Sequence, residues 1–416
     1  MLIAMASDAE TVVGSDPLAA RYRNVRALSE ALAAPLSDAD ASGQSMPDAS
    51  PAKWHLAHVT WFFETFVLRD HLPGYEPYDD RFAFLFNSYY EAEGPRHARP
   101  RRGMLSRPSL DEVRSYRAHV DEALNRALPS LAPAALELIE LGINHEQQHQ
   151  ELFLTDILAT FAENPLEPAY GELAPPACFA VEPVSWHRGR GGIVEIGAPD
   201  DGFAFDAERP RHRVFLAAHQ LANRRVTNRE WREFMDEGGY RTPTLWLSDG
   251  WAWAQQEGIA APLYWREDGT EFTLAGRREI DAAAPVAHIS FYEADAFARW
   301  AGARLPTEAE WEDFAASADP CLGNQLDLGG AVAPRAGGGL FGDVWEWTQS
   351  AFASYPGFAP AEGAVGEYNG KFMSGQLVLK GASCATPRGH SRPSYRNFFP
   401  PAARWQFTGV RLAQDA

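Results

Sequence analysis

The chain has 416 residues, which is long enough for two domains that each bury a full core. Its formal net charge of −19 at pH 7 argues against a nucleic acid or an anionic membrane as a partner, because phosphate groups would be repelled. The three cysteines are widely spaced and odd in number, so they do not form a disulfide framework. With no signal peptide and no apolar run of about 18 residues, the sequence predicts a cytoplasmic protein.

Helical periodicity extends over roughly the first 165 residues. Amphipathic segments are expected at Leu18–Leu32 and Leu110–Leu128, and Ser109 is the expected N-cap of the second. Another helix begins at Ser50, as N-cap, followed by a first-turn proline. The last helix covers Leu136–Phe161. Four such helices predict a helical bundle.

His145 and His149 are four residues apart on the last helix, so both imidazoles leave the same face about one turn from each other. The stripe around them is otherwise apolar, and burying neutral imidazoles is costly unless they are hydrogen-bonded or bind a divalent metal. The spacing favours a metal in the core of the bundle. With Glu146, the pattern is also the His-Glu-x-x-His signature of zinc peptidases, in which the glutamate is the base. A zinc metallopeptidase is therefore one alternative.

A third ligand is expected upstream, on the helix that follows Ser50. His55 and His58 lie one turn apart on this helix, and spacing alone does not choose between them. After His149 there is no His-x-x-Gly-x-x-His run of the kind that supplies the third ligand in some zinc peptidases.

A long irregular stretch, Pro73–Pro108, separates the second predicted helix from the third. It contains Tyr89 and Tyr90 and then a basic run with Arg96 and Arg99. A connection this long without regular structure is usually a functional loop or disordered. In an acidic chain, the basic run is the natural place to receive a substrate carboxylate, although a solvated loop has the same composition.

The character of the sequence changes between residues 164 and 183. Beyond this point, glycines and tryptophans are frequent, and short strands are expected at Arg213–Leu216 and Leu377–Leu379. Helices are expected at Thr227–Asp236 and Ser290–Ala301. We therefore expect an α+β protein, with a helical domain over residues 1–180 and an irregular α+β domain over residues 181–416.

The second part resembles the formylglycine-generating-enzyme (sulfatase-modifying-factor) fold, which is similar to C-type lectin domains. The motifs that carry this resemblance are Gly191–Gly197, Pro285–Ser290, Arg304–Glu312 and Gly342–Thr348. The first part resembles a DinB-like four-helix bundle, with Leu-Ala-His at His58 and the His145–His149 motif as its metal triad. A non-catalytic lectin-like binding module on a structural bundle is the alternative of another class.

Together, the two parts resemble the ergothioneine-biosynthesis sulfoxide synthases over the whole chain. The further motifs that resemble this family are Trp54–His58, Asn87–Glu91, His145–Glu151, Ser383–Pro387, Tyr395–Pro400 and Arg404–Phe407. The resemblance implies an enzyme in which His58, His145 and His149 hold a non-haem Fe(II) that activates O₂ as co-substrate. It also implies that a sulfur donor is joined to the imidazole C2 of hercynine (trimethylhistidine), usually giving a sulfoxide.

The same resemblance implies the residues that bind and convert hercynine. Gln148 and Asn397 match the positions that bind hercynine, and Tyr89 or Tyr90 is expected to donate a proton in the oxygen chemistry. A quaternary ammonium cannot be hydrogen-bonded and is best held by aromatic faces, which Phe398 and Phe399 offer.

The sulfur donor is expected to be cysteine rather than γ-glutamylcysteine. Family members that use γ-glutamylcysteine tend to carry Arg-Asn-Trp-Asp where this chain has Arg-Asn-Phe-Phe at residues 396–399, so a carboxylate is missing. Selenoneine synthases, which join a selenosugar to hercynine through a C–Se bond, are the related alternative.

Overall fold

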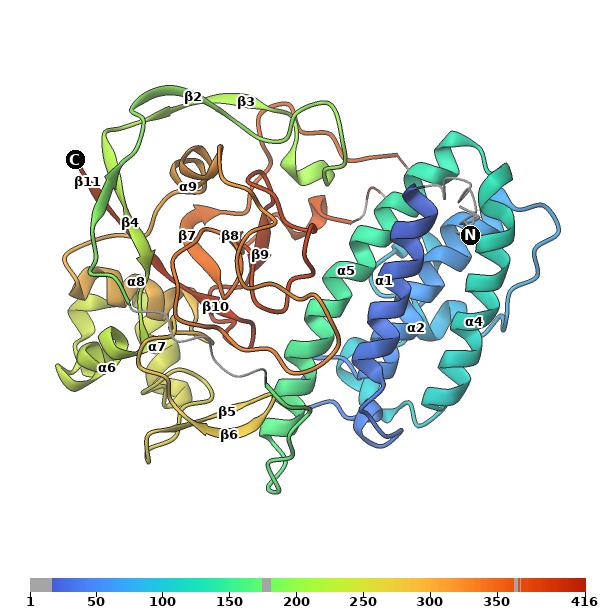
Figure 1. The fold of residues 1–416 in the computed structure, drawn as a ribbon, viewed down its shortest axis with the longest axis horizontal. Helices are drawn as coiled ribbons and strands as arrows, with labels where there is room; N and C mark the ends of the chain where they lie inside the picture. The colour runs from blue at the N-terminus through green and yellow to red at the C-terminus, as the bar shows by residue number, and fades with distance from the viewer. Residues whose placement is uncertain (1–16, 174–180, 363–365, 367) are drawn as a thin grey trace, which may run out of the picture.

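The computed structural model describes residues 17–173, 181–362, 366 and 368–416. Figure 1 shows a bundle of long helices, in blue to green, beside a mixture of short strands and helices in lime to red. Helix α5 (Pro133–Ala162) runs between these two parts. The expected α+β arrangement is confirmed. The expected domain boundary at residue 180 falls at the end of the stretch 174–180, which lies outside the described residues.

Four main helices form the first part, as expected. They are α1 (Pro17–Ala33), α2 (Ala52–Phe63), α4 (Leu110–Ala127) and α5. Helix α2 continues directly into a wider π-helical segment, η2 (Glu64–Arg69). Every helix keeps a largely apolar face toward the others, which is what closes the bundle.

One of the two predicted serine N-caps is confirmed and the other is wrong. Ser109 caps α4, because its hydroxyl accepts a hydrogen bond from the Glu112 amide at 3.2 Å. At the start of α2, however, the N-cap is Pro51, and the predicted Ser50 cap is wrong. The Ser50 hydroxyl accepts a hydrogen bond from Arg102 Nη1 at 2.8 Å instead, a partner that local sequence does not reveal.

The connection between η2 and α4 contains short helices and is not irregular throughout. These are α3 (Phe82–Phe86), η3 (Glu91–Glu93) and η4 (Arg99–Met104). Asn87 fixes the turn that carries the two tyrosines. Its side-chain amide donates to the carbonyls of Tyr90 at 3.0 Å and Gly94 at 3.2 Å, and its Oδ1 accepts from the Tyr90 amide at 3.2 Å.

Two sheets and two hairpins build the described residues of the second part. One sheet has the order β1-β4-β11 and the other the order β10-β7-β8-β9, in which only β10 and β7 are parallel. The hairpins are β2-β3 and β5-β6. The strands are β1 (Trp186–Arg188), β2 (Gly192–Ile196), β3 (His212–Leu216), β4 (His219–Arg225), β5 (Thr270–Thr273), β6 (Gly276–Glu279), β7 (Trp345–Ala351), β8 (Leu377–Gly381), β9 (Asn397–Phe399), β10 (Thr408–Gly409) and β11 (Arg411–Asp415).

The helices of the second part include both expected ones. They are α6 (Asn228–Asp236), α7 (Ser248–Glu257), α8 (Phe291–Trp300) and α9 (Glu308–Ala315). Helices α6 and α8 were expected, and each begins with a capping box. Helices α7 and α9 are additional; α9 begins inside the motif Arg304–Glu312.

Glu346, at the start of β7, is fully buried, and several side chains hold its carboxylate. Arg411 donates to it at 2.8 and 2.9 Å, Trp311 Nε1 donates at 2.6 Å, and Arg225 Nε lies 2.8 Å away. Burial alone would raise the pKa of the Glu346 carboxyl, but the charges of Arg411 and Arg225 lower this pKa below its usual range. The motif Gly342–Thr348 thus contributes a buried ion cluster to the core.

We expect Glu346→Gln to lower the free energy of unfolding by about 3–5 kcal/mol, because two buried arginines lose their counter-charge. A carboxyl with a depressed folded pKa gives stability that is present above its unfolded pKa, about 4.3, and is lost as pH falls through the folded pKa. Below about pH 4, wild-type stability should therefore fall more steeply than that of Glu346→Gln. Urea unfolding followed by tryptophan fluorescence measures both effects, and equal acid slopes would contradict this role of the cluster.

Helix α5 also links the two parts. Glu151 on this helix accepts hydrogen bonds from three groups of the second part: Trp345 Nε1 at 2.8 Å, Ser383 Oγ at 2.5 Å and Thr386 Oγ1 at 2.8 Å. One turn of α5 can therefore present groups to the bundle core and to the second part at once.

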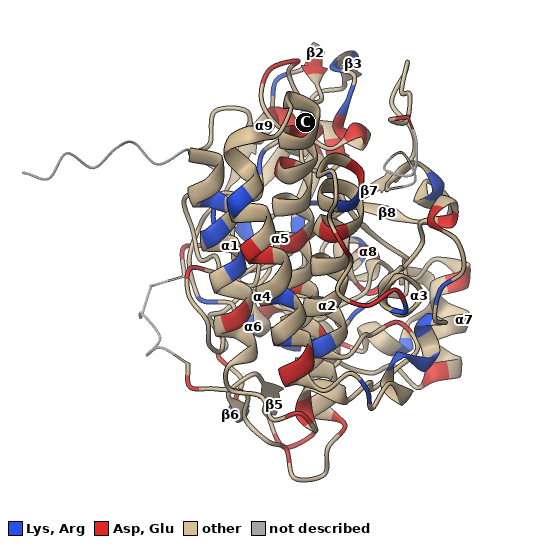
Figure 2. Cartoon of the chain, turned by 90° about the vertical axis from the view of Figure 1, so that its right-hand side faces the viewer, with Lys and Arg blue, Asp and Glu red and all other residues tan. Residues whose placement is uncertain are grey.

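Basic and acidic residues are interspersed over the bundle helices on the face shown in Figure 2. Within the described part of the chain, every helix is too short or too polar to cross a membrane.

Candidate metal centre

Three histidines meet in the core of the bundle, His58 from α2 and His145 and His149 from α5. Their ligand nitrogens all lie within 4.8 Å of one another, and this is the one such group of histidine, cysteine or acidic residues in the described ranges. His58 is 0% exposed and His145 is 1% exposed. The spacing of His145 and His149 on one helix face therefore brings both rings to His58, as the sequence predicts.

The hydrogen bonds of these rings leave nitrogens free to bind a metal. His58 Nδ1 contacts the Phe86 carbonyl at 2.6 Å and must donate to it, so His58 Nε2 keeps its lone pair. His58 Nε2 and both nitrogens of His145 are buried without a hydrogen-bond partner. Unsatisfied buried nitrogens are costly, so this arrangement fits a metal better than a pair of hydrogen-bonded core histidines.

The three imidazoles are neutral at physiological pH. Burial lowers the pKa of His145 to about 3 and lowers the pKa of His58 and of His149 well below the usual range. Neutral imidazole is the form that coordinates metals, so no proton has to be displaced from these rings before binding.

His55 lies beside the triad but its two ring nitrogens are already used. His55 Nδ1 contacts His149 Nδ1 at 2.8 Å, and His55 Nε2 contacts Asp156 Oδ2 at 3.0 Å. Burial lowers the pKa of His55 as well. His58, whose Nε2 has no hydrogen-bond partner, is therefore better placed than His55 to be the third ligand.

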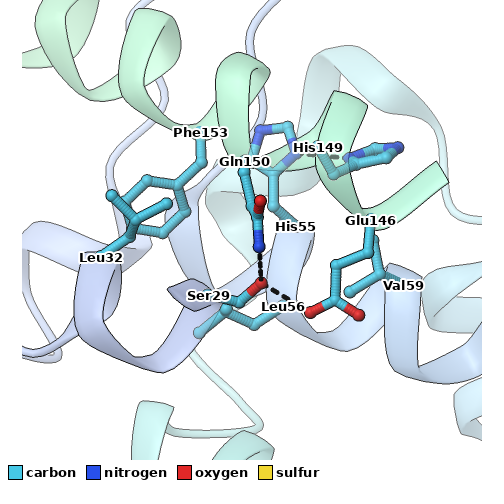
Figure 3. A pocket seen from close by; sticks show the side chains of 9 residues that line it. All are labelled: Ser29, Leu32, His55, Leu56, Val59, Glu146, His149, Gln150 and Phe153. Carbon is cyan, nitrogen blue, oxygen red and sulfur yellow. Dashed lines mark hydrogen bonds between the residues drawn. The ribbon is translucent and has the colours of Figure 1, made fainter. Parts of the chain in front are cut away.

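Glu146 does not face the histidine triad. Its carboxylate accepts hydrogen bonds from Ser29 Oγ at 2.5 Å, Arg26 Nη1 at 3.0 Å and Arg117 Nη2 at 3.0 Å. Figure 3 shows this carboxylate directed at Ser29. Burial alone would raise the pKa of Glu146, but the charges of Arg26 and Arg117 lower it to about 2. A carboxylate fixed in this way is unsuited to be the base of a zinc peptidase.

The two predicted tyrosines lie in layers beside the bundle core. Tyr90 is fully buried, with its ring 5.6 Å from that of Trp61, and Tyr89 stacks on Tyr90 at 5.2 Å. Tyr368 of the second part, which the sequence did not single out, packs edge-on against His145 at 5.5 Å. No periodicity or spacing marks Tyr368, so only the fold could find it.

Gln148 lies on α5 where the bundle meets the second part. Its Oε1 accepts from the hydroxyl of Tyr368, and its Nε2 donates to the hydroxyl of Tyr395 at 2.6 Å. The structure thus joins Gln148, through Tyr368, to His145. Tyr395 also stacks on Trp345 at 5.4 Å, which gives the junction an aromatic wall.

Asn397, Phe398 and Phe399 form strand β9, in which successive side chains point to opposite faces. Phe398 stacks on Phe352 at 4.0 Å, in a small apolar cluster of the second part. Phe399 packs against Trp405 at 5.9 Å, and Trp405 in turn donates to Asp156 of α5. Asn397 shares a face with Phe399, so the structure separates Phe398 from these two residues.

The predicted arginines lie on the surface connection and have partners there. Arg96 donates to Glu91 at 2.5 Å, and Arg99 donates to the Asp48 carbonyl. Arg102, in the same connection, is 3% exposed, and its guanidinium carbon lies 3.3 Å from the centre of the Trp54 ring. Trp54 stacks in turn on His58, so this stack connects Arg102 to the triad.

Comparisons with known proteins agree with this arrangement. Residues 21–153 match the DinB superfamily, and residues 188–335 and 338–416 match the sulfatase-modifying factor enzyme 1-like domain. Hercynine oxygenase from Mycobacterium tuberculosis is 35% identical over 408 residues, covering 91% of this chain and 94% of that protein. The hercynine oxygenase of Mycolicibacterium smegmatis is also 35% identical, over 417 residues, with the same coverage.

More distant relatives share parts of the chain. Ergothioneine biosynthesis protein 1 of Schizosaccharomyces pombe is 24% identical over 354 residues, covering 74% of this chain and 44% of that protein. Among solved structures, PvdO from Pseudomonas aeruginosa covers 57% of this chain and all of its own at 18% identity, with a TM-score of 0.36. On the near full-length matches at 35% identity, the chain is an oxidative enzyme of the hercynine oxygenase family.

Proposed function

We propose that this protein uses Fe(II) and O₂ to join a small thiol to the imidazole C2 of hercynine, giving a sulfoxide in ergothioneine biosynthesis. The observation that carries the proposal is a group of three neutral buried imidazoles in a chain related over 91% of its length to hercynine oxygenases. The reaction balances with one O₂. The C–H and S–H hydrogens leave in one water molecule, and the second oxygen atom remains on sulfur.

His58, His145 and His149 are the residues that would hold the iron. The unpartnered nitrogens of His58 and His145 and the lowered pKa of all three rings support this assignment. Iron, when bound, supplies the centre at which O₂ and a thiolate react.

Hercynine is proposed to lie between α5 and the second part. Gln148 would hydrogen-bond the substrate, with Asn397 supplying polarity from β9. The trimethylammonium needs aromatic faces, because burying it unpaired would cost several kcal/mol. Phe399, which packs against Trp405, is better placed for this than Phe398, which packs against Phe352.

Tyr89 or Tyr90 is proposed to donate a proton during the oxygen chemistry. Burial raises the pKa of Tyr89 to about 12, so its hydroxyl is protonated at neutral pH and available as a donor. We expect the double variant Tyr89→Phe, Tyr90→Phe to lower kcat by at least roughly tenfold or to change the oxidation state of the product. Steady-state rates and mass spectrometry of the product test this. Wild-type rate with the wild-type product would remove both tyrosines from the mechanism and leave Tyr368 as the remaining one beside His145.

The sulfur donor is proposed to be cysteine, with its carboxylate received by Arg96 or Arg99. Phe399 stands where γ-glutamylcysteine-using enzymes carry an acid, so the groups that would bind the longer donor are incomplete. Selenosugar is the alternative donor, giving selenoneine chemistry.

One experiment tests the function and the donor together. The full chain is reconstituted anaerobically with Fe(II), then given O₂, hercynine and either cysteine, γ-glutamylcysteine or selenosugar. We expect a hercynine–cysteine sulfoxide by mass spectrometry. A product from selenosugar alone would establish the selenium alternative, and no product from any donor would overturn the proposed function.

We also propose a domain boundary near residue 180, between the two family matches that end at 153 and begin at 188.

A cytoplasmic location is proposed because Cys321 and Cys384 are both free thiols, as a reducing compartment would keep them. The charge of −19 supports small molecules rather than nucleic acid or membrane as partners.

A further inference from the structure

A line of hydrogen bonds runs from the second part of the molecule to one histidine of the triad. Trp405 Nε1 donates to Asp156 Oδ1 at 3.2 Å. Asp156 Oδ2 contacts His55 Nε2 at 3.0 Å, and His55 Nδ1 contacts His149 Nδ1 at 2.8 Å. His55 is 4% exposed and Asp156 3%, so water does not replace these partners.

The direction of each hydrogen bond follows from its fixed donors. Asp156 receives two N–H groups that can only donate, the Trp405 indole and the Ser50 amide, the latter at 2.7 Å. Asp156 Oδ1 accepts from Trp405 and Oδ2 accepts from Ser50, so we take the third contact, at Oδ2, as a donation from His55 Nε2–H. The neutral His55 ring then keeps a lone pair on Nδ1, and this atom can only accept.

The contact with His55 also fixes the tautomer of His149. Because His55 Nδ1 accepts, His149 Nδ1 must carry the hydrogen, and the lone pair of His149 lies on Nε2. His58 is fixed in the same tautomer by the Phe86 carbonyl. A tautomer with hydrogen on Nε2 would set two lone pairs against each other at the 2.8 Å contact and would leave Nε2 unable to coordinate.

We propose that His55 and Asp156 are positioning residues that hold His149 with its Nε2 lone pair toward the metal, and that Trp405 links this state to the docked second domain. The inference rests on the proposed triad binding a metal. It assigns a role to His55 that a packed apolar residue could not fill, since the position needs an acceptor on one side and a donor on the other. Partners of this kind orient a ligating imidazole and raise its basicity.

The tautomers themselves are measurable in the metal-free, full-length wild-type protein. Histidine labelled with ¹⁵N at both ring positions gives nitrogen shifts that distinguish N–H from bare nitrogen, and loss of signals in single-histidine variants assigns them. We expect His149 to be protonated on Nδ1 and bare on Nε2, and His55 to be protonated on Nε2 and bare on Nδ1. The opposite pattern at either ring of the wild-type protein would overturn the proposal.

Metal affinity provides a second test of the positioning role. His55→Phe keeps ring volume but removes both functions, and we expect it to weaken Co(II) and Fe(II) binding by roughly 10–100-fold. His55→Gln offers one donor and one acceptor and should recover most of that loss, while Trp405→Phe should cause a smaller loss. His119→Phe, at an exposed bundle histidine outside the site, is the matched control and should bind metal like wild type.

Unchanged affinity in a folded His55→Phe protein would contradict the role of His55. Two results distinguish a failure of the positioning role from a failure of the proposed function. Reversed tautomers in a protein that still makes product from hercynine would remove only the positioning role. The expected tautomers and metal binding in a protein that makes no hercynine product would remove only the proposed function.

Discussion

His145→Ala is expected to abolish stoichiometric iron binding and, with it, product formation. The triad nitrogens lie within 4.8 Å of one another. When His145 is removed, only His58 and His149 of the triad remain, and the buried surroundings of His145 do not supply a third ligand. Both nitrogens of His145 lack a hydrogen-bond partner, so the stability that the metal-free protein loses on the change should come from the cavity left by the ring. Elemental analysis after anaerobic loading measures the iron, and urea unfolding of the metal-free protein measures the stability.

The matched control for this variant is His119→Ala, at an exposed position of α4. It should retain one iron per chain. Stoichiometric iron in His145→Ala would contradict the triad. If His145→Ala does not fold, His58→Ala and His149→Ala test the same prediction, because each of them should also abolish iron binding.

Gln148→Ala is expected to lower kcat/KM for hercynine by roughly 10–100-fold while leaving iron content unchanged, because one or two hydrogen bonds to a charged substrate are lost. Gln148 reaches the second part from the metal helix through Tyr368 and Tyr395. Asn397→Ala should show a smaller loss of the same kind, about tenfold, from the opposite side of the junction.

Gln147→Ala provides the control, since Gln147 is the preceding residue of the same helix and points about 100° away around the axis. It should keep wild-type kinetics. Hercynine kinetics that are unchanged in both Gln148→Ala and Asn397→Ala would place the substrate elsewhere.

The bundle half of the site is readable from local sequence. The four-residue spacing of His145 and His149 and their apolar surroundings are properties of one helix, so a pattern of period 3.6 reveals them. Local sequence does not distinguish His55 from His58, because both lie on buried turns of α2. What separates them is the carboxylate of Asp156, about 100 residues further along the chain.

The junction half depends on contacts that no local pattern encodes. Tyr368, Tyr395 and Trp405 approach α5 from segments more than 200 residues away in sequence. Strand alternation on β9 would have separated Phe398 from Phe399, had the strand been recognised, but three residues are too few for a period of two to be visible. The Ser50 cap failed for a related reason, since Arg102 takes the hydroxyl that the local motif assigns to the helix.

In the proposed function, one iron held by His58, His145 and His149 acts on hercynine at the junction of the two parts. Anomalous diffraction at the iron edge, from crystals of the full chain loaded anaerobically with Fe(II) and hercynine, tests this most directly. We expect a single anomalous peak within bonding distance of nitrogens of these three histidines, with the hercynine imidazole between that peak and Gln148. A peak at other residues, or hercynine bound away from α5, would contradict it.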